Sequence, residues 1–309
     1  MRALNGFPIL LRHMLVAVVL SCFAWVCGYK LTPRLKEYLS WQYLIAFCNK
    51  FDGNQSTGVS DAWCALPSPL LWAHAGGGQL GFYTNSKEAI EESIRLGYKV
   101  IEVDISLTSD NVPVLSHKFS PGGILAFPQR PSLDEFMSTP ICGRWTPLSL
   151  KDLIDLYADS DVVFSIDPHL DDFDLIGYMK RHAPKAFLER CIYQIYTVSD
   201  FKRLATDNPF GALHYCIDES LLARGGIPQL IKMLTTLGVN SVSFGERPIS
   251  KEIMEAIACF RNANIVVSIA CVNTRERALE WLRIGANCFD SDLLVPDDII
   301  FESAADAEK

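Results

Sequence analysis

The chain has 309 residues and a mass of 34.5 kDa, enough for one large barrel or two average domains. Apolar residues make up 49% and charged residues 21%, which excludes wholesale disorder. Lys and Arg number 28 against 36 Asp and Glu, a net charge of −8. That balance argues against a protein that covers nucleic acid with a basic face.

An apolar segment without charged residues, Met14–Tyr29, lies near the start of the chain. A membrane span needs about 20 apolar residues, so the segment is long enough if Arg12 and Lys30 extend their charged ends to the interface. A cleaved signal peptide has a similar basic start, but no small-x-small cleavage site follows. A lipoprotein-like box at 19–22 is disfavoured because the apolar run continues past its cysteine. We therefore predict an uncleaved single-pass anchor.

Three segments follow from this interpretation. They are an N-terminal membrane anchor over residues 1–32, a bridging segment over 33–67 and a folded domain over 68–309. Basic residues flank the apolar segment on both sides, so the positive-inside rule gives little direction. We expect the domain on the extracytoplasmic side, the usual arrangement for a short head followed by one large domain.

From residue 70 onward, short β-branched runs alternate with amphipathic stretches. The runs predicted as strands are Leu70–Ala73, Lys99–Ile105, Val112–Ser116, Val162–Ile166, Cys191–Ile195, Ala212–Ile217, Ser241–Phe244, Ile265–Ala270 and Asn287–Phe289. The stretches predicted as helices are Ser86–Leu96, Leu150–Ala158, Phe173–Arg181, Asp200–Thr206, Pro228–Leu237, Lys251–Asn262 and Thr274–Ile284.

This alternation over about 240 residues is typical of an α/β protein of the (β/α)₈ TIM-barrel type. One of the nine predicted strands is then an extra hairpin or not a strand. A doubly wound open sheet is the alternative, and it is disfavoured because no G-x-G-x-x-G loop joins a first strand to a helix. The irregular residues 118–147 form a long connection, which we expect to act as a lid over the barrel mouth.

The ten cysteines are scattered singly, and none forms a C-x-x-C pair. Zinc clusters and a small disulfide scaffold are therefore disfavoured. We expect buried thiols that pack as small apolar side chains, with one or two disulfides in an oxidising compartment as the alternative. Cys271, at a predicted strand end, is interpreted as a packing residue rather than a nucleophile, because no base other than the histidines accompanies it.

Titratable side chains stand at the ends of the first four predicted strands, where barrel enzymes place their active sites. In chain order they are His74, Glu102 with Asp104, His117 and Asp167. Because Glu102 and Asp104 are two residues apart, their side chains face the same way on a strand. With Asp167 they would repel one another unless neutralised. Three hard oxygen ligands suit Mg²⁺ or Ca²⁺ better than zinc.

His74 and His117 flank this predicted cation site. The ordinary pKa of histidine lies near working pH, so two imidazoles beside a bound anion make a suitable general acid and general base. Three glycines follow His74, and we expect them to allow close approach of the backbone to a substrate. On strand Lys99–Ile105, Val100 shares the inward face with the two carboxylates.

An ordered set of motifs resembles the glycerophosphodiester phosphodiesterase family. The motifs are His74-Ala75-Gly76-Gly77, Thr84-Asn85-Ser86, Glu102-Val103-Asp104, Thr108-Ser109-Asp110 and Ser116-His117. The family reads His-Arg-Gly, Glu-Asn-Thr, Glu-x-Asp, Thr-x-Asp-Gly and His-Asp at these spacings. Later matches are Ser165-Ile166-Asp167, Cys271-Val272-Asn273 and Gly285–Asp292, so the resemblance covers residues 68–296.

The resemblance implies a phospholipase-C-like TIM barrel that hydrolyses glycerophosphodiesters or lysophospholipids with a divalent cation, Mg²⁺ or Ca²⁺. It implies that the metal ligands are Glu102, Asp104 and Asp167, that the proton carriers are His74 and His117, and that Asn85 binds substrate. The expected partner is a small phosphodiester or a lipid head group, reached at the membrane through the N-terminal helix, and not nucleic acid.

Four positions depart from the family pattern. Its arginine is Ala75 here, its first glutamate Thr84, its lysine His169 and the aspartate after its second histidine Lys118. We expect Lys118 and His169 to return positive charge to the substrate site. Two alternatives remain open: an impaired family member that binds a phosphorylated head group, and a phospholipase-D-like lyase that forms a cyclic phosphate.

Overall fold

The computed structural model describes residues 70–120, 127, 129–170, 173–196, 200–201, 203–204, 207–217 and 226–299. Within these residues no helix has the length and apolar character needed to span a bilayer. The predicted anchor and bridging segment, residues 1–32 and 33–67, lie outside the described part of the chain.

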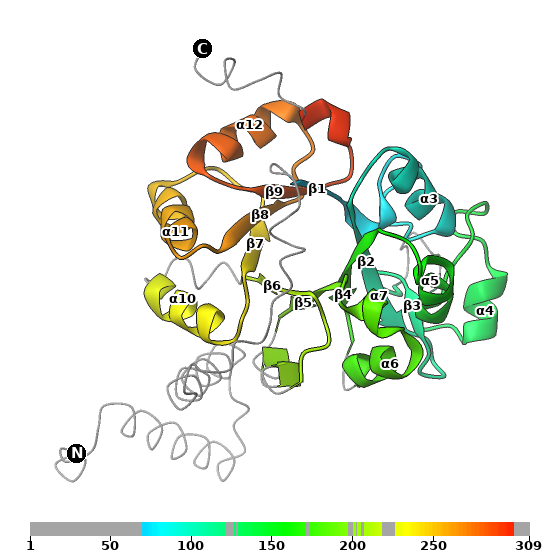
Figure 1. The fold of residues 1–309 in the computed structure, drawn as a ribbon. Coiled ribbons are helices and arrows are strands. Elements are labelled where there is room, and N and C mark those ends of the chain that lie inside the picture. The colour runs from blue at the N-terminus through cyan, green and yellow to red at the C-terminus, as the bar shows by residue number, and fades with distance from the viewer. Residues whose placement is uncertain are drawn as a thin grey trace, which may run out of the picture.

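Eight parallel strands close into a barrel (Figure 1). They are β1 (Leu70–Ala73), β2 (Val100–Leu107), β4 (Val163–Pro168), β5 (Ile192–Ile195), β6 (Ala212–Cys216), β7 (Ser241–Gly245), β8 (Val266–Ala270) and β9 (Cys288–Ser291). Each strand pairs with the next, and β1 pairs with both β9 and β2, which closes the ring. The predicted (β/α)₈ architecture is therefore confirmed.

The ninth predicted strand is the extra hairpin that the barrel interpretation allowed. It is β3 (Pro113–Leu115), and it pairs antiparallel with the end of β2. The hairpin brings the chain straight back from β2, so the residue that follows β3 stays at the barrel mouth. Ser116 N–H donates to the carbonyl of Asp104 at 2.9 Å, and His117 comes next.

The helices surround the ring of strands (Figure 1). They are α3 (Lys87–Arg95), α4 (Leu133–Ser138), α5 (Leu150–Tyr157), α6 (Leu175–His182), α7 (Lys185–Leu188), α10 (Ile227–Thr236), α11 (Lys251–Asn262) and α12 (Arg275–Ile284), with 3₁₀ turns η2 (His74–Gly76) and η3 (Pro296–Ile299). Hydroxyl N-caps explain where four of them begin, since the side chains of Ser86, Ser149, Ser250 and Thr274 accept from the first turn. The helix predicted over 200–206 lies only partly among the described residues.

Residues 118–147 were predicted to be irregular, and this prediction is wrong for part of the segment. They contain α4, which begins with a capping box in which Ser132 and Glu135 cap each other reciprocally. Phe136 of this helix is fully buried. The serine–glutamate spacing was a readable helix signal that the prolines and glycines of the segment obscured. The lid prediction stays a prediction, because part of the segment lies outside the described residues.

The barrel interior changes character from bottom to top. Its lower layer is apolar and consists of Leu70, Trp72, Val100, Ile192, Ala212 and Cys288. Val100 thus shares the inward face of β2 with Glu102, as predicted, while Ile101 belongs to the outer core between strands and helices. His214 is buried against Trp72 at 5.1 Å between rings, and burial lowers its pKa to about 3. It is a structural histidine of the barrel interior.

Candidate active site

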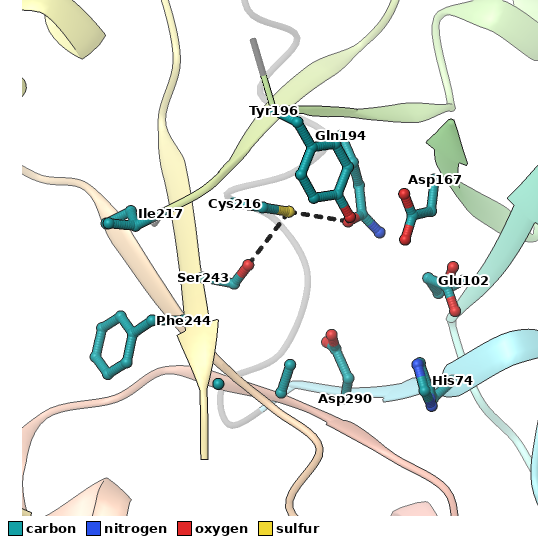
Figure 2. A pocket seen from close by; sticks show the side chains of 12 residues that line it. His74, Glu102, Asp167, Gln194, Tyr196, Cys216, Ile217, Ser243, Phe244 and Asp290 are labelled. Atoms are coloured by element: carbon teal, nitrogen blue, oxygen red, sulfur yellow. Dashed lines mark hydrogen bonds between the residues drawn. The ribbon is translucent and has the colours of Figure 1, made fainter. Parts of the chain in front are cut away.

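Three carboxylates meet at the top of β2 and β4. Residue pairing between these strands sets Asp104 opposite Asp167, and Glu102 lies one inward position below Asp104. One oxygen from each of the three carboxylates lies within 4.8 Å of the others. Figure 2 shows Glu102 and Asp167 pointing into the same cavity. The structure therefore brings together the three residues predicted as metal ligands.

Two loop residues hold the carboxylates of β2. Ala75 N–H donates to Glu102 Oε2 at 2.6 Å. Asn85 binds Asp104 twice, because its Nδ2 donates to Oδ2 at 2.8 Å and its Oδ1 accepts from the backbone N–H at 3.0 Å. Both residues have left-handed backbone conformations, with φ of 50° and 48°. The fully buried Asn85 side chain, predicted to bind substrate, is committed here to Asp104.

The donor set fits a hard divalent cation. Burial and the neighbouring Asp104 raise the pKa of Glu102 well above its usual range. Burial acts the same way on Asp104, but hydrogen bonds from His169 and Asn85 outweigh it and lower its pKa. Among the described residues, the buried Glu102 Oε1 and Asp167 Oδ1 have no hydrogen-bond partner. Buried carboxylate oxygens are costly in that state, and a cation ligated by them removes the cost.

His169 supplies positive charge to the same cluster. Its Nε2 lies 2.8 Å from Asp104 Oδ1 and 3.3 Å from Asp167 Oδ2. Burial lowers the pKa of His169, but the two carboxylates outweigh it and raise the value to about 10. The residue that replaces the family's lysine therefore faces the carboxylates, where an imidazolium offsets part of their repulsion.

His74 stands at the end of β1 and is oriented by Asp292. Its Nδ1 is 2.7 Å from Asp292 Oδ1. Asn273 fixes that carboxylate by donating to Oδ2 at 3.2 Å and accepting from the backbone N–H of Asp292 at 2.8 Å. Burial lowers the pKa of His74, but the hydrogen bonds with Asp292 and Cys271 outweigh it and hold the pKa far above its ordinary value. His74 is therefore an imidazolium at neutral pH.

His117 has the opposite electrostatic setting. Burial and the nearby His169 and Lys118 lower its pKa, and the attraction of Asp104 does not offset them. The exposed Lys118 follows directly in the chain. Tyr83 lies between the two predicted proton carriers, with its ring 4.9 Å from that of His74 and 5.5 Å from that of His117. No sequence pattern pointed to Tyr83, because its position depends on the loop after β1.

A cavity of about 220 Å³ opens beside the carboxylates (Figure 2). His74, Glu102 and Asp167 line one side, and Gln194, Tyr196, Cys216 and Ser243 line the other. Asp290 points into it from β9, and burial raises its pKa to about 6. The predicted strand stopped at Phe289, so Asp290 was missed. The alternation of β9, with Cys288 facing inward, was the signal that could have found it.

The glycines after His74 serve the protein's own packing, and their predicted role in close approach to a substrate stays a prediction. A Cβ at Gly78 would lie 2.0 Å from the backbone oxygen of Asp292, and one at Gly77 would lie 2.0 Å from Ser93 Oγ. Gly77 also has a φ of +115°, a conformation that other residues rarely adopt. The glycines thus allow the loop after β1 to pack against α3 and the end of β9.

The fold and the site together define a TIM barrel with a carboxylate cluster and two histidines at its mouth. The model of the glycerophosphoryl diester phosphodiesterase family matches residues 74–122, which contain His74, Asn85, Glu102, Asp104, His117 and Lys118. The predicted resemblance is confirmed over this segment. The enzyme class predicted from the motifs, phosphoric diester hydrolase, is the class of that family. No curated protein matches the chain.

Solved structures agree on the fold. A glycerophosphodiester phosphodiesterase from Thermotoga maritima is 18% identical, with a TM-score of 0.56 over 72% of this chain and 94% of its own. A phosphodiesterase from Oleispira antarctica, in complex with the product sn-glycerol-3-phosphate, is 16% identical, with a TM-score of 0.58 over 75% and 95%. One from Parabacteroides distasonis is also 16% identical, with a TM-score of 0.58 over 87% and 95%. At these identities the likeness confirms the barrel.

Replacing the amide that holds Asp104 should weaken cation binding. We expect Asn85→Ala to lower the affinity for Mn²⁺ by about 10–100-fold, the usual cost of losing an outer contact to a metal ligand. Calorimetric titration of the full-length protein measures it. The control is Asn262→Ala, the same substitution at an exposed position of α11. Equal affinities in the two variants would contradict a positioning role for Asn85.

Removing the charge of Asp292 should lower the pKa of His74. In Asp292→Asn the amide no longer stabilises the imidazolium, while burial still disfavours it, so the pKa falls even though Cys271 and Glu102 still favour the charged form. NMR titration of ¹³C-labelled histidine follows the His74 signal. Asp155→Asn, on the exposed face of α5, is the control and should leave that signal unchanged. An unaltered His74 titration in Asp292→Asn would show that the contact does not set its charge.

Proposed function

We propose that this protein is a divalent-metal-dependent phosphodiesterase that hydrolyses glycerophosphodiester-type substrates. The observation that carries the proposal is the convergence of three carboxylates within 4.8 Å at the barrel mouth, with a histidine on either side of them. His117 has a ring nitrogen within 4.8 Å of Asp104, and His74 lines the same cavity as Glu102 and Asp167. The pKa of His74 is raised and that of His117 is lowered. A pair of titratable groups whose surroundings move them apart is the pattern of an acid and a base poised for the same reaction.

Glu102, Asp104 and Asp167 would hold the cation, Mg²⁺ or Ca²⁺. When bound, it supplies positive charge for a phosphoryl oxygen and for the negative charge that develops there. The unpartnered oxygens of Glu102 and Asp167 support this ligand set. Asn85 and the backbone N–H of Ala75 keep two of the carboxylates in place. His169 and Lys118 would add the chain's own positive charge near the phosphate.

The histidines take the proton-transfer roles. Neutral His117 accepts the proton of the attacking oxygen, and the imidazolium of His74 donates one to the leaving oxygen. Asp292 keeps the His74 ring oriented during the transfer, because Asn273 holds the carboxylate in turn. Tyr83, between the two rings, limits the space available to the scissile group.

The size and the polar lining of the cavity support the proposal that a small polar group of the substrate enters the barrel. At about 220 Å³, with carboxyl, amide, hydroxyl and thiol groups on its walls, it suits a glycerol phosphate better than an acyl chain. The structural neighbour from Oleispira antarctica was solved with sn-glycerol-3-phosphate as product. A lysophospholipid would have to leave its acyl chain outside the cavity.

The proposal predicts metal-dependent turnover of glycerophosphocholine by the full-length protein. Choline release in Mg²⁺ or Ca²⁺, with lysophosphatidylcholine in parallel, measures it, and a chelator should abolish it. We expect His74→Ala to lose about 10²–10⁴-fold in kcat while the carboxylate cluster still binds Mn²⁺, since the histidine moves protons and does not belong to that cluster. His182→Ala, an exposed histidine of α6, is the matched control.

Two outcomes would contradict this. Turnover that survives both the chelator and His74→Ala would belong to another site or a contaminant. Cation binding without turnover of any diester would instead indicate an impaired family member that binds a phosphorylated head group. Phosphorus NMR of the products distinguishes hydrolysis from a lyase reaction, because only the lyase leaves a cyclic phosphate.

We further propose that residues 1–32 anchor the enzyme as a single-pass protein with its barrel on the extracytoplasmic side. A charge at the centre of the apolar segment costs about 2.5–3.5 kcal/mol of insertion free energy. Val18→Lys should therefore move the protein from carbonate-washed membranes into the supernatant, whereas Val18→Leu should stay in the pellet. Immunoblots of the two fractions measure this, and wild-type protein in the supernatant would disprove the anchor.

A further inference from the structure

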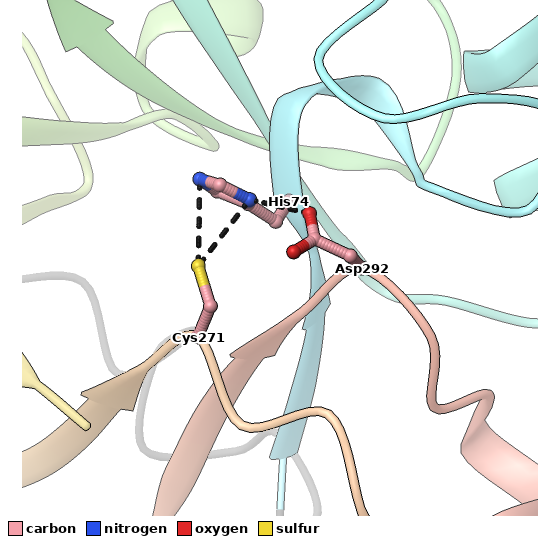
Figure 3. Close-up of side chains that lie close together, drawn as sticks. All are labelled: His74, Cys271 and Asp292. Atoms are coloured by element: carbon pink, nitrogen blue, oxygen red, sulfur yellow. Dashed lines mark hydrogen bonds and ion pairs between the residues drawn. The ribbon is translucent and has the colours of Figure 1, made fainter. Parts of the chain in front are cut away.

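The carboxyl ends of β8, β9 and β1 bring a thiol, a carboxylate and an imidazole together (Figure 3). Cys271 follows β8, Asp292 follows β9 and His74 follows β1, and these three strands are neighbours in the barrel. One ligand atom from each residue lies within 4.8 Å of the others. We propose that this cluster binds a zinc-type divalent cation, at a site distinct from the carboxylate cluster, and that its occupation inhibits the enzyme.

The chemistry of the donors separates the two sites. The carboxylate cluster of Glu102, Asp104 and Asp167 offers only oxygen, the ligand that Mg²⁺ and Ca²⁺ prefer. The second cluster adds a sulfur and a nitrogen, which favour Zn²⁺ and Co²⁺. Three protein ligands with a fourth position left for water is the arrangement of open zinc sites. The cavity that His74 lines provides room for that water.

The distances suit such an ion. Zinc bound to sulfur at about 2.3 Å and to nitrogen at about 2.0 Å with a tetrahedral angle would separate the two ligand atoms by about 3.5 Å. Cys271 Sγ lies 3.4 Å from His74 Nδ1 and 3.7 Å from Nε2. His74 Nδ1 and Asp292 Oδ1, now hydrogen-bonded at 2.7 Å, would have to separate to about 3.3 Å.

One ligand of the proposed site is already held in place, and the other two are partly accessible. Asn273 holds Asp292 by its Oδ2 and by its backbone N–H, so the carboxylate is oriented before an ion arrives. His74 lines the cavity, and Cys271 is only partly buried. An ion that enters the cavity therefore meets the imidazole of His74, and the thiol of Cys271 lies 3.4 Å beyond its Nδ1.

Binding is balanced by the loss of two protons. The cation replaces the thiol proton of Cys271 and the proton that His74 shares with Asp292, and both go to solvent. An imidazole that is ligated through one nitrogen and carries N–H on the other has no lone pair left and is no longer an imidazolium. His74 then cannot donate or recover a proton. This inhibition rests on the proposed function, whereas the metal site itself does not.

Cobalt absorption tests the site without reference to activity. The full-length protein is titrated with Co²⁺ in excess Mg²⁺, which occupies the carboxylate cluster, and the thiolate-to-cobalt charge-transfer band is recorded. We expect the band in the wild type and in Cys216→Ser, and its loss in Cys271→Ser. Cys216 is a matched control, because its thiol lines the cavity that His74 also lines but donates a hydrogen bond to Gln194 Oε1 at 3.0 Å. No band in the wild type, or an equal band in Cys271→Ser, would overturn the proposal.

Zinc inhibition of diester turnover tests the consequence. In excess Mg²⁺, with each variant compared to its own zinc-free rate, Cys271→Ser should need at least about tenfold more Zn²⁺ for half inhibition than the wild type or Cys216→Ser. Equal zinc sensitivity in all three would show that zinc acts elsewhere, and would refute the inhibitory role. If no variant turns over a diester, the proposed function fails, and the cobalt spectra still decide the site.

Discussion

The repulsion among three carboxylates in one small volume is the constraint on which the site depends. Glu102, Asp104 and Asp167 are placed side by side by the pairing of β2 with β4 and by the inward alternation of both strands. The register of β2 and β4 keeps their backbone positions adjacent while the barrel is closed. The surrounding residues must therefore compensate, through the N–H of Ala75, the amide of Asn85 and the imidazolium of His169.

The same constraint explains why the two catalytic candidates carry different charges. His74 shares a proton with Asp292 and so keeps its positive charge despite burial. His117 lies next to His169, whose charge is fixed by the carboxylates, and this like charge adds to the effect of burial on its pKa. The opposite pKa shifts of the two histidines thus follow from the charged groups that surround each ring, because the two side chains are chemically identical.

Local pattern was enough to predict the barrel and the first part of the site. The two-residue spacing of Glu102 and Asp104 fixes their common face, and the strand–helix alternation places His74 and Asp167 at one end of the sheet. His117 reaches the same end through the antiparallel hairpin of β2 and β3. Asp292 lies 218 residues from His74 in the chain, and its contact depends on the closure of β9 against β1. No pattern within a short window contains that information.

Cys271 shows most clearly where sequence reasoning stops. At a strand end beside a valine and an asparagine, it has the pattern of a packing residue, and burial does raise its pKa, as expected of an inert thiol. Closure of the barrel then puts this thiol beside the imidazole on which proton transfer depends. A cation that prefers sulfur and nitrogen would bind beside this thiol, whereas a cation that prefers oxygen would bind the carboxylate cluster, because each donor set favours its own class of cation. The barrel mouth therefore combines an all-oxygen donor set with a second donor set that contains sulfur and nitrogen and includes His74.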